Sequence, residues 1–268
     1  MIADNSQIND IHIHFGEFRD CFFAPESIDN ILNQCGVTRY SAMLFPNNLP
    51  LNKERDFWLY SKLLEQNVNT DLILVVSPEL FNQDKNLGIL GILPFKMIKL
   101  HGALHNWHPN GKAIKQIFKI AQNKNMPIML HTGGRAKSDA GSYLNICLEF
   151  PKVKVILAHS RPFEDTIKVM KMCPNVWADT SFLPIDKIIS FDKDGLNDRV
   201  IFGTDFPIAP FFSNEENIHA WYKRNITKMV SGLGLNTFNA ISNGNYINFF
   251  YDYPLAYLNL NFDICGSI

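Results

Sequence analysis

Two histidines stand one residue apart near the start of this 268-residue chain, in the stretch NDIHIHFG. Side chains alternate between the two faces of a strand, so His12 and His14 are predicted on one face with Asp10, while Ile11 and Ile13 point the other way. Two imidazoles on one strand face can bind a single zinc, iron or manganese ion. A polar strand face, or two buried histidines bonded to backbone carbonyls, would give the same pattern.

Other residues with useful chemistry follow apolar segments further along the chain. They are Lys99 and His101 in MIKLHG, His131 after IML, His159 after ILA, Asp179 after NVWA, and Asp205 after IFGT. An imidazole at the end of a buried strand is costly unless it gains a partner, and a metal ion supplies several partners at once. Three histidines, an aspartate and an open position would make a catalytic site in which the metal lowers the pKa of water and Asp205 takes its proton.

The elements that must position these residues are short apolar strands alternating with helices. We predict eight strands, over residues 11–15, 39–44, 72–77, 97–102, 127–133, 154–160, 175–181 and 200–207. The intervening segments have helical periodicity, as in KAIKQIFKIA, where apolar residues recur at i, i+3, i+4 and i+7. This alternation predicts an α/β fold, a (β/α)₈ TIM barrel, whose active site lies at the C-terminal ends of the strands. An open doubly wound sheet is the alternative, but HFGEFRD after the first strand lacks its glycine-rich phosphate loop.

Composition favours one domain over residues 1–268, with an extra C-terminal helix at about 235–252 and then a tail. Charged residues make up 19% of the chain and the net charge is −1, so no basic patch for nucleic acid or an anionic membrane is predicted. We expect a small-molecule substrate as the partner, and the pattern leaves open a homo-oligomer. The N-terminal residues lack the basic and apolar regions of a secretory signal, which predicts a cytoplasmic location.

Six motifs together resemble the amidohydrolase superfamily, specifically amidohydrolase-related family 2, whose members are TIM-barrel metal-dependent hydrolases. They are HxH in the first predicted strand, then HTGG, LAHSRP, NVWADTS, VIFGTDFP and GNYINFF in chain order. The resemblance implies that His12, His14, His131 and Asp205 ligate one divalent metal ion, most often zinc, with manganese as the alternative.

The same resemblance implies catalytic roles for Asp205, which would shuttle a proton, and for His159, which would orient the water or polarise the scissile carbonyl. In binuclear relatives His159 would instead complete a second metal site, and the mononuclear role is favoured here. Binuclear relatives place a carboxylated lysine at the fourth strand as a metal bridge. Lys99 is the candidate for such a second metal, and His101 competes for that position. Otherwise Lys99 would pair with an anionic substrate.

Three further residues are candidates for substrate binding. Arg161 follows His159 by two residues, where its guanidinium could hold a substrate carboxylate through two hydrogen bonds. His105 and Trp107 lie in the loop after the fourth predicted strand, where barrel enzymes often build specificity, although an exposed polar loop explains them equally well.

The leading hypothesis is a metal-dependent hydrolase that uses activated water on an amide, ester or lactone carbonyl of a small, carboxylated substrate. A metal-dependent decarboxylase and a metal-independent lactonase of the same family are the alternatives. A nuclease of the TatD type also begins with HxH, but it carries a glutamate where this chain has KLHG. A non-catalytic ligand-binding barrel is disfavoured because every residue of the expected site is present.

Overall fold

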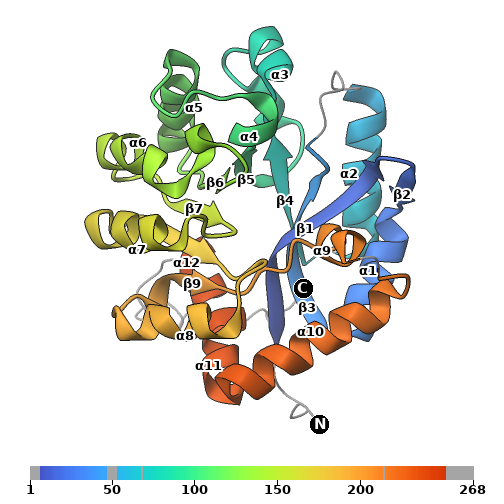
Figure 1. The fold of residues 1–268 in the computed structure, drawn as a ribbon. Helices are drawn as coiled ribbons and strands as arrows, with labels where there is room; N and C mark the ends of the chain where they lie inside the picture. The colour runs from blue at the N-terminus through green and yellow to red at the C-terminus, as the bar shows by residue number, and fades with distance from the viewer. Residues whose placement is uncertain (1–6, 47–52, 68, 214, 252–268) are drawn as a thin grey trace, which may run out of the picture.

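The strands of this protein form a closed barrel, as seen in a computed structural model that describes residues 7–46, 53–67, 69–213 and 215–251 (Figure 1). Within these residues the strands are β1 (Ile8–Phe18), β2 (Cys21–Phe23), β3 (Val37–Leu44), β4 (Thr70–Val75), β5 (Phe95–Leu100), β6 (Ile128–His131), β7 (Val155–Ala158), β8 (Val176–Asp179) and β9 (Val200–Ile201). They pair in the order β2-β1-β3-β4-β5-β6-β7-β8-β9. All neighbouring pairs are parallel except β1 with β2, which form a hairpin.

The barrel closes where β1 meets the segment that follows β9. The amide of Ile11 donates to the carbonyl of Phe202 at 3.0 Å, and the amide of His14 donates to the carbonyl of Phe206 at 2.7 Å. A parallel bridge between Ile13 and Phe206 lies between these two bonds. The fold is therefore the predicted TIM barrel, and the open doubly wound sheet is excluded. The short antiparallel strand β2 was not predicted.

Most of the helices surround the strands on the outside of the barrel (Figure 1), and the last helix, α12, covers one of its ends. The helices are α1 (Pro25–Gln34), α2 (Lys53–Gln66), α3 (Pro78–Gln83), α4 (Gly102–His105), α5 (Lys112–Asn123), α6 (Leu144–Glu149), α7 (Phe163–Met172), α8 (Ile185–Lys193), α9 (Ile208–Phe212), α10 (Ile218–Leu233), α11 (Leu235–Asn239) and α12 (Asn245–Phe250). The apolar stripe predicted in KAIKQIFKIA is the buried face of α5. Among the described residues, no helix is both long enough and apolar enough to cross a membrane.

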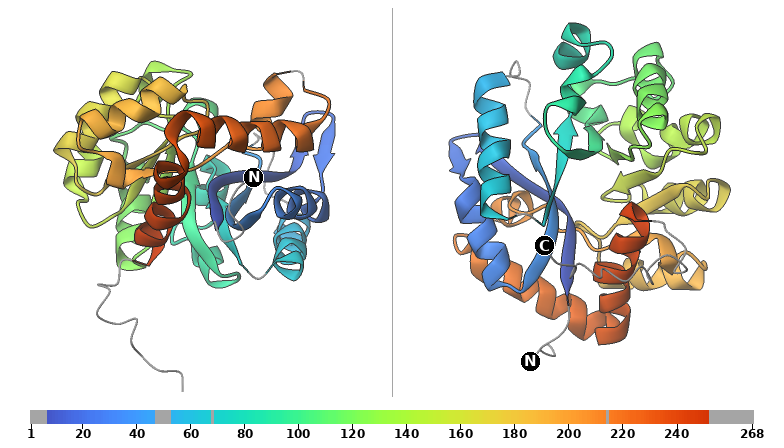
Figure 2. Two further views of the ribbon diagram at one scale, coloured as in Figure 1. Left: turned by 90° about the horizontal axis from the view of Figure 1, so that it is seen from below. Right: turned by 180° about the vertical axis from the view of Figure 1, so that it is seen from behind.

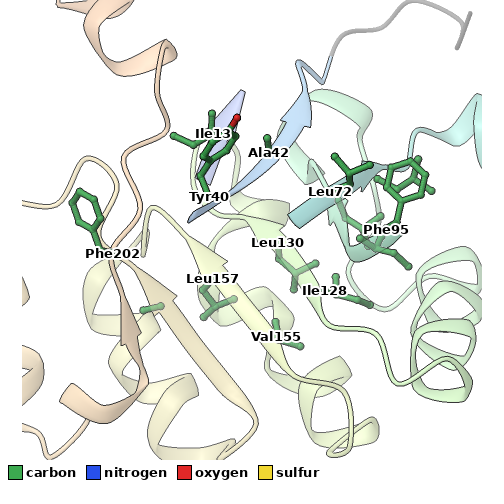
Figure 3. Packing of buried hydrophobic residues seen from close by; sticks show 14 of the residues in the cluster. Ile13, Tyr40, Ala42, Leu72, Phe95, Ile128, Leu130, Val155, Leu157 and Phe202 are labelled. Carbon is green, nitrogen blue, oxygen red and sulfur yellow. The ribbon is translucent and has the colours of Figure 1, made fainter. Parts of the chain in front are cut away.

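The main hydrophobic core lies between the strands and the surrounding helices. Figure 3 shows part of this layer, with Tyr40, Leu72, Leu130 and Leu157 on the strands and Phe202 just after β9. The same cluster contains buried side chains of the helices, such as Leu32 of α1 and Phe118 of α5. Strands that are covered on both faces carry apolar residues at nearly every position, and this explains why their sequences are continuous apolar runs. The layer fixes the strands and so fixes where their C-terminal ends lie.

A second, smaller core fills the inside of the barrel. Each strand of the barrel contributes apolar side chains to it, and Tyr246 and Phe249 of α12 close the N-terminal end of the barrel. The Tyr246 hydroxyl donates to Asp71 at 2.8 Å and lies 2.8 Å from the Ser41 hydroxyl. The rear view in Figure 2 shows the C-terminal helical segment in front of the strands.

This C-terminal segment was predicted as one extra helix at about 235–252. Between Leu235 and Phe250 the chain forms α11, a π-helical turn (Ala240–Gly244) and α12 in succession. The predicted tail beyond it lies outside the described residues. The single-domain assignment remains a proposal, supported by the continuity of the barrel core from β1 to α12.

A bulge in β1 changes which residues share a face. The register of β1 against β3 shifts between Asp10 and Ile13, so the side-chain alternation breaks there. Ile11 therefore packs inside the barrel, while Ile13 packs against the helices outside it. The prediction that Asp10 shares a face with His12 was wrong, because Asp10 instead accepts hydrogen bonds from Thr204 and from Tyr222 of α10.

Candidate active site

A pocket of about 500 Å³ opens at the C-terminal end of the barrel. Eight of the residues singled out in the sequence line it: His12, His14, Lys99, His101, His131, His159, Arg161 and Asp205. They come from β1, β5 and β6 and from the segments that follow β5, β7 and β9, as the TIM barrel requires of an active site. The remaining wall is largely apolar, and it includes Phe18, Leu104, Phe182, Ile208 and Phe212.

Three ligand atoms converge on one point at the floor of this pocket. Oδ1 of Asp205 lies 3.0 Å from Nε2 of His12 and 3.0 Å from Nε2 of His14. The two imidazole nitrogens are 3.3 Å apart. Each of these side chains is almost completely buried.

Asp179 at the end of β8 fixes the orientation of two of the histidines. Its Oδ2 lies 2.7 Å from Nδ1 of His12, so this ring nitrogen carries the proton and donates it. Its Oδ1 accepts from the amide of His159 at 2.8 Å and from the Ser181 hydroxyl at 2.7 Å. Gly203 permits this packing, because a Cβ there would lie 3.2 Å from the Cβ atoms of both Asp179 and His12.

A chain of hydrogen bonds determines the tautomers of His159 and His131. The Ser181 hydroxyl donates its only proton to Asp179, so at 2.8 Å it must accept from Nδ1 of His159. Nε2 of a neutral His159 is then an acceptor, and Nδ1 of His131 lies 3.1 Å from it. The His131 ring stacks on His101 with a centroid distance of 3.7 Å.

Burial and charge set the protonation states of the cluster. Burial raises the pKa of Asp205, but the charge of His12 and the hydrogen bonds from His12 and His14 outweigh it, so the net pKa lies well below the usual range. Burial lowers the pKa of His14 to about 4 and holds the pKa of His159 well below its ordinary value. His12 differs, because its neighbours Asp205 and Asp179 raise its pKa despite burial and despite the Lys99 charge.

Lys99 lies beside this cluster and is almost fully buried. Its Nζ is 3.2 Å from Nε2 of His12. Burial lowers the pKa of Lys99 to about 8, although the charges of Asp205 and Asp179 act in the opposite direction. The amine is therefore close enough to the ligand atoms to contact whatever they bind.

The backbone holds two of these side chains in an unusual conformation. His159 has φ 69° and Asp205 has φ 57°, both in the left-handed region that costs a residue with a Cβ roughly 1–2 kcal/mol. Such strain concentrates at functional sites, where the surrounding structure compensates for it. Both residues come just after a strand, and both side chains are buried in the lining of the pocket.

The residues present fit a divalent metal ion. Nδ1 of His12 donates its proton to Asp179, so in a neutral His12 the other ring nitrogen, Nε2, carries a lone pair. This lone pair faces Oδ1 of Asp205, which is also a hydrogen-bond acceptor. Two acceptors 3.0 Å apart require a cation between them, either a proton or a metal. Two imidazoles and one carboxylate suit zinc or manganese. His131 lines the same pocket, but its contacts are with His159 and His101 rather than with this three-atom group.

Two predicted substrate-binding residues do not line the pocket. Trp107 is buried in the outer core, where its ring meets Phe81 edge-on at a centroid distance of 6.3 Å. His105 is buried behind His101. The loop between β5 and α5 folds back onto the barrel, and this removes both from the substrate's path.

Sequence reasoning missed Ser181 and Arg19. Ser181 follows Asp179 by two residues in ADTS, and this spacing is its only signal. Arg19 lines the pocket from the turn between β1 and β2, a hairpin that was not predicted.

These features define a TIM-barrel enzyme with a buried histidine and aspartate cluster at the mouth of its barrel. The family model for amidohydrolases matches residues 90–245, more than half of the chain. The chain therefore belongs to the amidohydrolase family, and it is an enzyme of that family. No curated protein sequence is significantly similar to it.

Several solved structures share the fold. A probable 2-pyrone-4,6-dicarboxylic acid hydrolase from Acinetobacter baumannii, with citric acid bound, has a TM-score of 0.65 and 16% identity over 91% of this chain and 99% of its own. Dihydroorotase from Saccharomyces cerevisiae, in complex with 5-fluoroorotic acid, has a TM-score of 0.64 and 18% identity over 94% and 85%. A manganese-bound dihydroxybenzoic acid decarboxylase from a Polaromonas species has a TM-score of 0.64 and 12% identity over 91% and 97%. Identities this low establish the fold but not the reaction.

Proposed function

We propose that this protein is a metal-dependent hydrolase that cleaves an amide, ester or lactone carbonyl of a small carboxylated substrate. The observation that carries the proposal is the convergence of Nε2 of His12, Nε2 of His14 and Oδ1 of Asp205 within 3.3 Å of one another in the pocket floor. These residues would hold one divalent ion, zinc or manganese, with His131 as a further ligand on the same wall. A bound ion would polarise the substrate carbonyl and lower the pKa of nearby water.

His159 is the best placed general base. Its Nδ1 donates to Ser181, so Nε2 is the basic atom of the ring, and burial keeps the neutral imidazole dominant. Nδ1 of His131 lies 3.1 Å from this Nε2, so water would take the place of that contact when it gives up its proton. As water attacks the carbonyl carbon, its proton passes to Nε2. The imidazolium formed is stabilised through Ser181 by the Asp179 carboxylate, and it returns the proton to the leaving oxygen or nitrogen when the acyl bond breaks.

This assignment alters the roles expected of His159 and Asp205. A neutral His159 with its proton on Nδ1 has no N–H to offer an oxyanion, so it suits proton transfer better than carbonyl polarisation. Asp205, with a pKa well below its usual range, is a weak base and suits metal ligation. Hydrolysis is favoured over decarboxylation because decarboxylation needs a proton donor at the carbon that loses carbon dioxide, whereas hydrolysis begins with a proton acceptor.

Positive charge supports a carboxylated substrate. Arg161 and Lys99 line the pocket, and among the described residues that line it Asp205 is the only acidic one. Metal ligation would engage the Asp205 carboxylate, which leaves these two cations for a substrate anion. Nζ of Lys99 lies 3.2 Å from Nε2 of His12, so a carboxylated Lys99 could instead bridge to a second metal, and the metal stoichiometry decides between its two roles.

The test combines metal analysis with activity. Protein purified without chelators or a histidine tag is expected to contain about one equivalent of zinc or manganese, measured by plasma mass spectrometry. H12A and H14A should lose it. H159Q should retain it, while ring opening of carboxylated lactones, followed by absorbance, falls roughly 100- to 10,000-fold.

H108A is the matched control, since His108 lies in the exposed part of the loop before α5 and outside the pocket. It should change neither metal content nor rate. Folded protein that takes up no metal would overturn the proposal in favour of a metal-independent lactonase. About two equivalents would make Lys99 a bridging residue. Release of carbon dioxide in place of ring opening would assign the decarboxylase reaction.

A further inference from the structure

Two arginines that line the active-site pocket have no carboxylate partner in the part of the chain that the structure describes. Arg19 lies in the turn between β1 and β2, and Arg161 follows β7. Among the described residues, neither guanidinium makes an ion pair or a hydrogen bond, whereas Arg39, Arg55 and Arg224 each pair with an acid. An arginine at a pocket mouth with unused donors is equipped to bind an anion.

Arg161 is held in place by its surroundings. Its amide donates to the Thr132 hydroxyl at 2.7 Å, and its guanidinium carbon lies 5.0 Å from the centre of the Phe182 ring. Gly133 makes room for its side chain, because a Cβ there would lie 2.9 Å from Cβ of Arg161. Stacking of this kind orients the planar fork while leaving its N–H groups available.

Arg19 has a comparable platform on the other side. Its guanidinium carbon lies between 5.2 and 5.6 Å from the ring centres of Phe18, Phe211 and Phe212. Its φ of 53° is left-handed, as a two-residue hairpin turn requires. The turn therefore presents an arginine above an aromatic surface at the edge of the pocket.

The barrel separates the two arginines. In the closed order of eight parallel strands, β1 and β7 lie nearly opposite each other. Figure 1 and the rear view of Figure 2 both show the β1–β2 hairpin and β7 on opposite sides of the molecule. The pocket that both arginines line also contains the cluster of His12, His14 and Asp205 and the apolar side chains of Phe18, Phe182 and Phe212.

From this arrangement we infer that the substrate is a dicarboxylate with a flat ring, held by Arg161 at one carboxylate and by Arg19 at the other. The inference rests on the proposed function and specifies its substrate class. The aromatic walls contact the faces or edges of the ring, and the cavity of about 500 Å³ admits a single ring with two carboxylates. The scissile carbonyl is then held above the cluster in the floor.

Binding of non-reactive probes tests this inference without relying on catalysis. Isophthalate carries two carboxylates on one ring, benzoate carries one, and isophthalamide carries none. By isothermal titration calorimetry, isophthalate should bind at least 10-fold more tightly than benzoate, and isophthalamide more weakly than both. R19Q and R161Q should each weaken isophthalate binding roughly 10- to 100-fold, the loss expected for a charge-assisted bidentate contact.

Benzoate separates a two-point clamp from general electrostatics. It can use either arginine, so each single variant should weaken its binding no more than about twofold, while the double variant R19Q/R161Q should weaken it strongly. R224Q is the control, because it removes one exposed positive charge from α10 outside the pocket. It should leave all three affinities unchanged.

Equal affinity for isophthalate and benzoate, or R19Q that binds isophthalate like the unaltered protein, would overturn the inference. Circular dichroism and a thermal melt confirm that each variant is folded. Titrations of chelator-treated protein should show the same dependence on arginine, and this separates the clamp from chelation of a metal by the probe. A protein that contains no metal but shows this dependence would refute the hydrolase proposal and leave the dicarboxylate site standing.

Discussion

Asp179 is the residue on which the geometry of the site depends most, although it does not line the pocket. Its two oxygens contact His12, the amide of His159 and Ser181, so one carboxylate orients a proposed metal ligand and the proposed base. Burial raises the pKa of Asp179, but the hydrogen bond and the charge of His12 lower it by more. The net pKa is below the ordinary value, so the carboxylate stays ionised. Such outer contacts commonly set metal affinity as strongly as the ligands themselves.

Substitution D179N should therefore weaken metal binding by roughly 10- to 100-fold. An asparagine side chain has one acceptor oxygen, so it cannot accept from the His12 ring on one side and from the His159 amide and the Ser181 hydroxyl on the other. Competition with a fluorescent chelator measures the metal Kd. The matched variant S181A removes the hydroxyl that joins His159 Nδ1 to Asp179 but leaves the contact between Asp179 and His12 in place. It should leave the metal Kd unchanged while lowering kcat, and a metal Kd that D179N leaves unaltered would contradict this role.

At the scale of elements, α12 closes the N-terminal end of the barrel and completes its inner core. Phe249 packs edge-on against Trp177 of β8 at a centroid distance of 5.4 Å, and only 1% of its surface is exposed. The segment from α11 to α12 thus functions as part of the barrel, even though it follows the last strand.

Substitution F249A should reduce the free energy of unfolding by about 3–5 kcal/mol, the usual cost of removing a buried phenylalanine. Urea denaturation followed by circular dichroism measures the change. I247A lies two residues earlier on the same helix, where 43% of the isoleucine is exposed, and it should cost less than about 1 kcal/mol. Equal losses for both variants would show that α12 does not depend on its inward face.

At the scale of the whole molecule, the proposed metal site joins the first and last strands. His12 and His14 belong to β1, and Asp205 follows β9, so a shared ion would join the two edges that close the barrel. Asp10 and Thr204 already connect the same two segments through a hydrogen bond of 2.6 Å. Metal binding and barrel stability should therefore be coupled.

Saturation with zinc or manganese at about 100 times Kd should stabilise the folded state by about 2.7 kcal/mol. For a barrel of this size, that corresponds to a rise in Tm of roughly 5–10 °C. Differential scanning calorimetry with and without a chelator measures it. H14A should melt at the same temperature in both conditions, and a metal-dependent rise that persists in H14A would place the ion elsewhere.

The sequence by itself determined the barrel and the positions of the candidate site residues at the ends of its strands. Apolar runs of strand length can be recognised from the local sequence, and the C-terminal ends of parallel strands lie together at one end of a barrel. For this reason one site could be predicted from the sequence for His12, His131, His159 and Asp205. The resemblance of the motifs then gave the family.

Only the tertiary structure decided which atoms meet. The bulge in β1 moved Asp10 away from His12, and the folded loop after β5 removed Trp107 from the pocket. The proton on Nδ1 of His159 follows from Ser181, a contact between different strand ends. Distances between residues far apart in the chain depend on how the barrel closes and how its loops pack, and no local pattern of residue types contains that information.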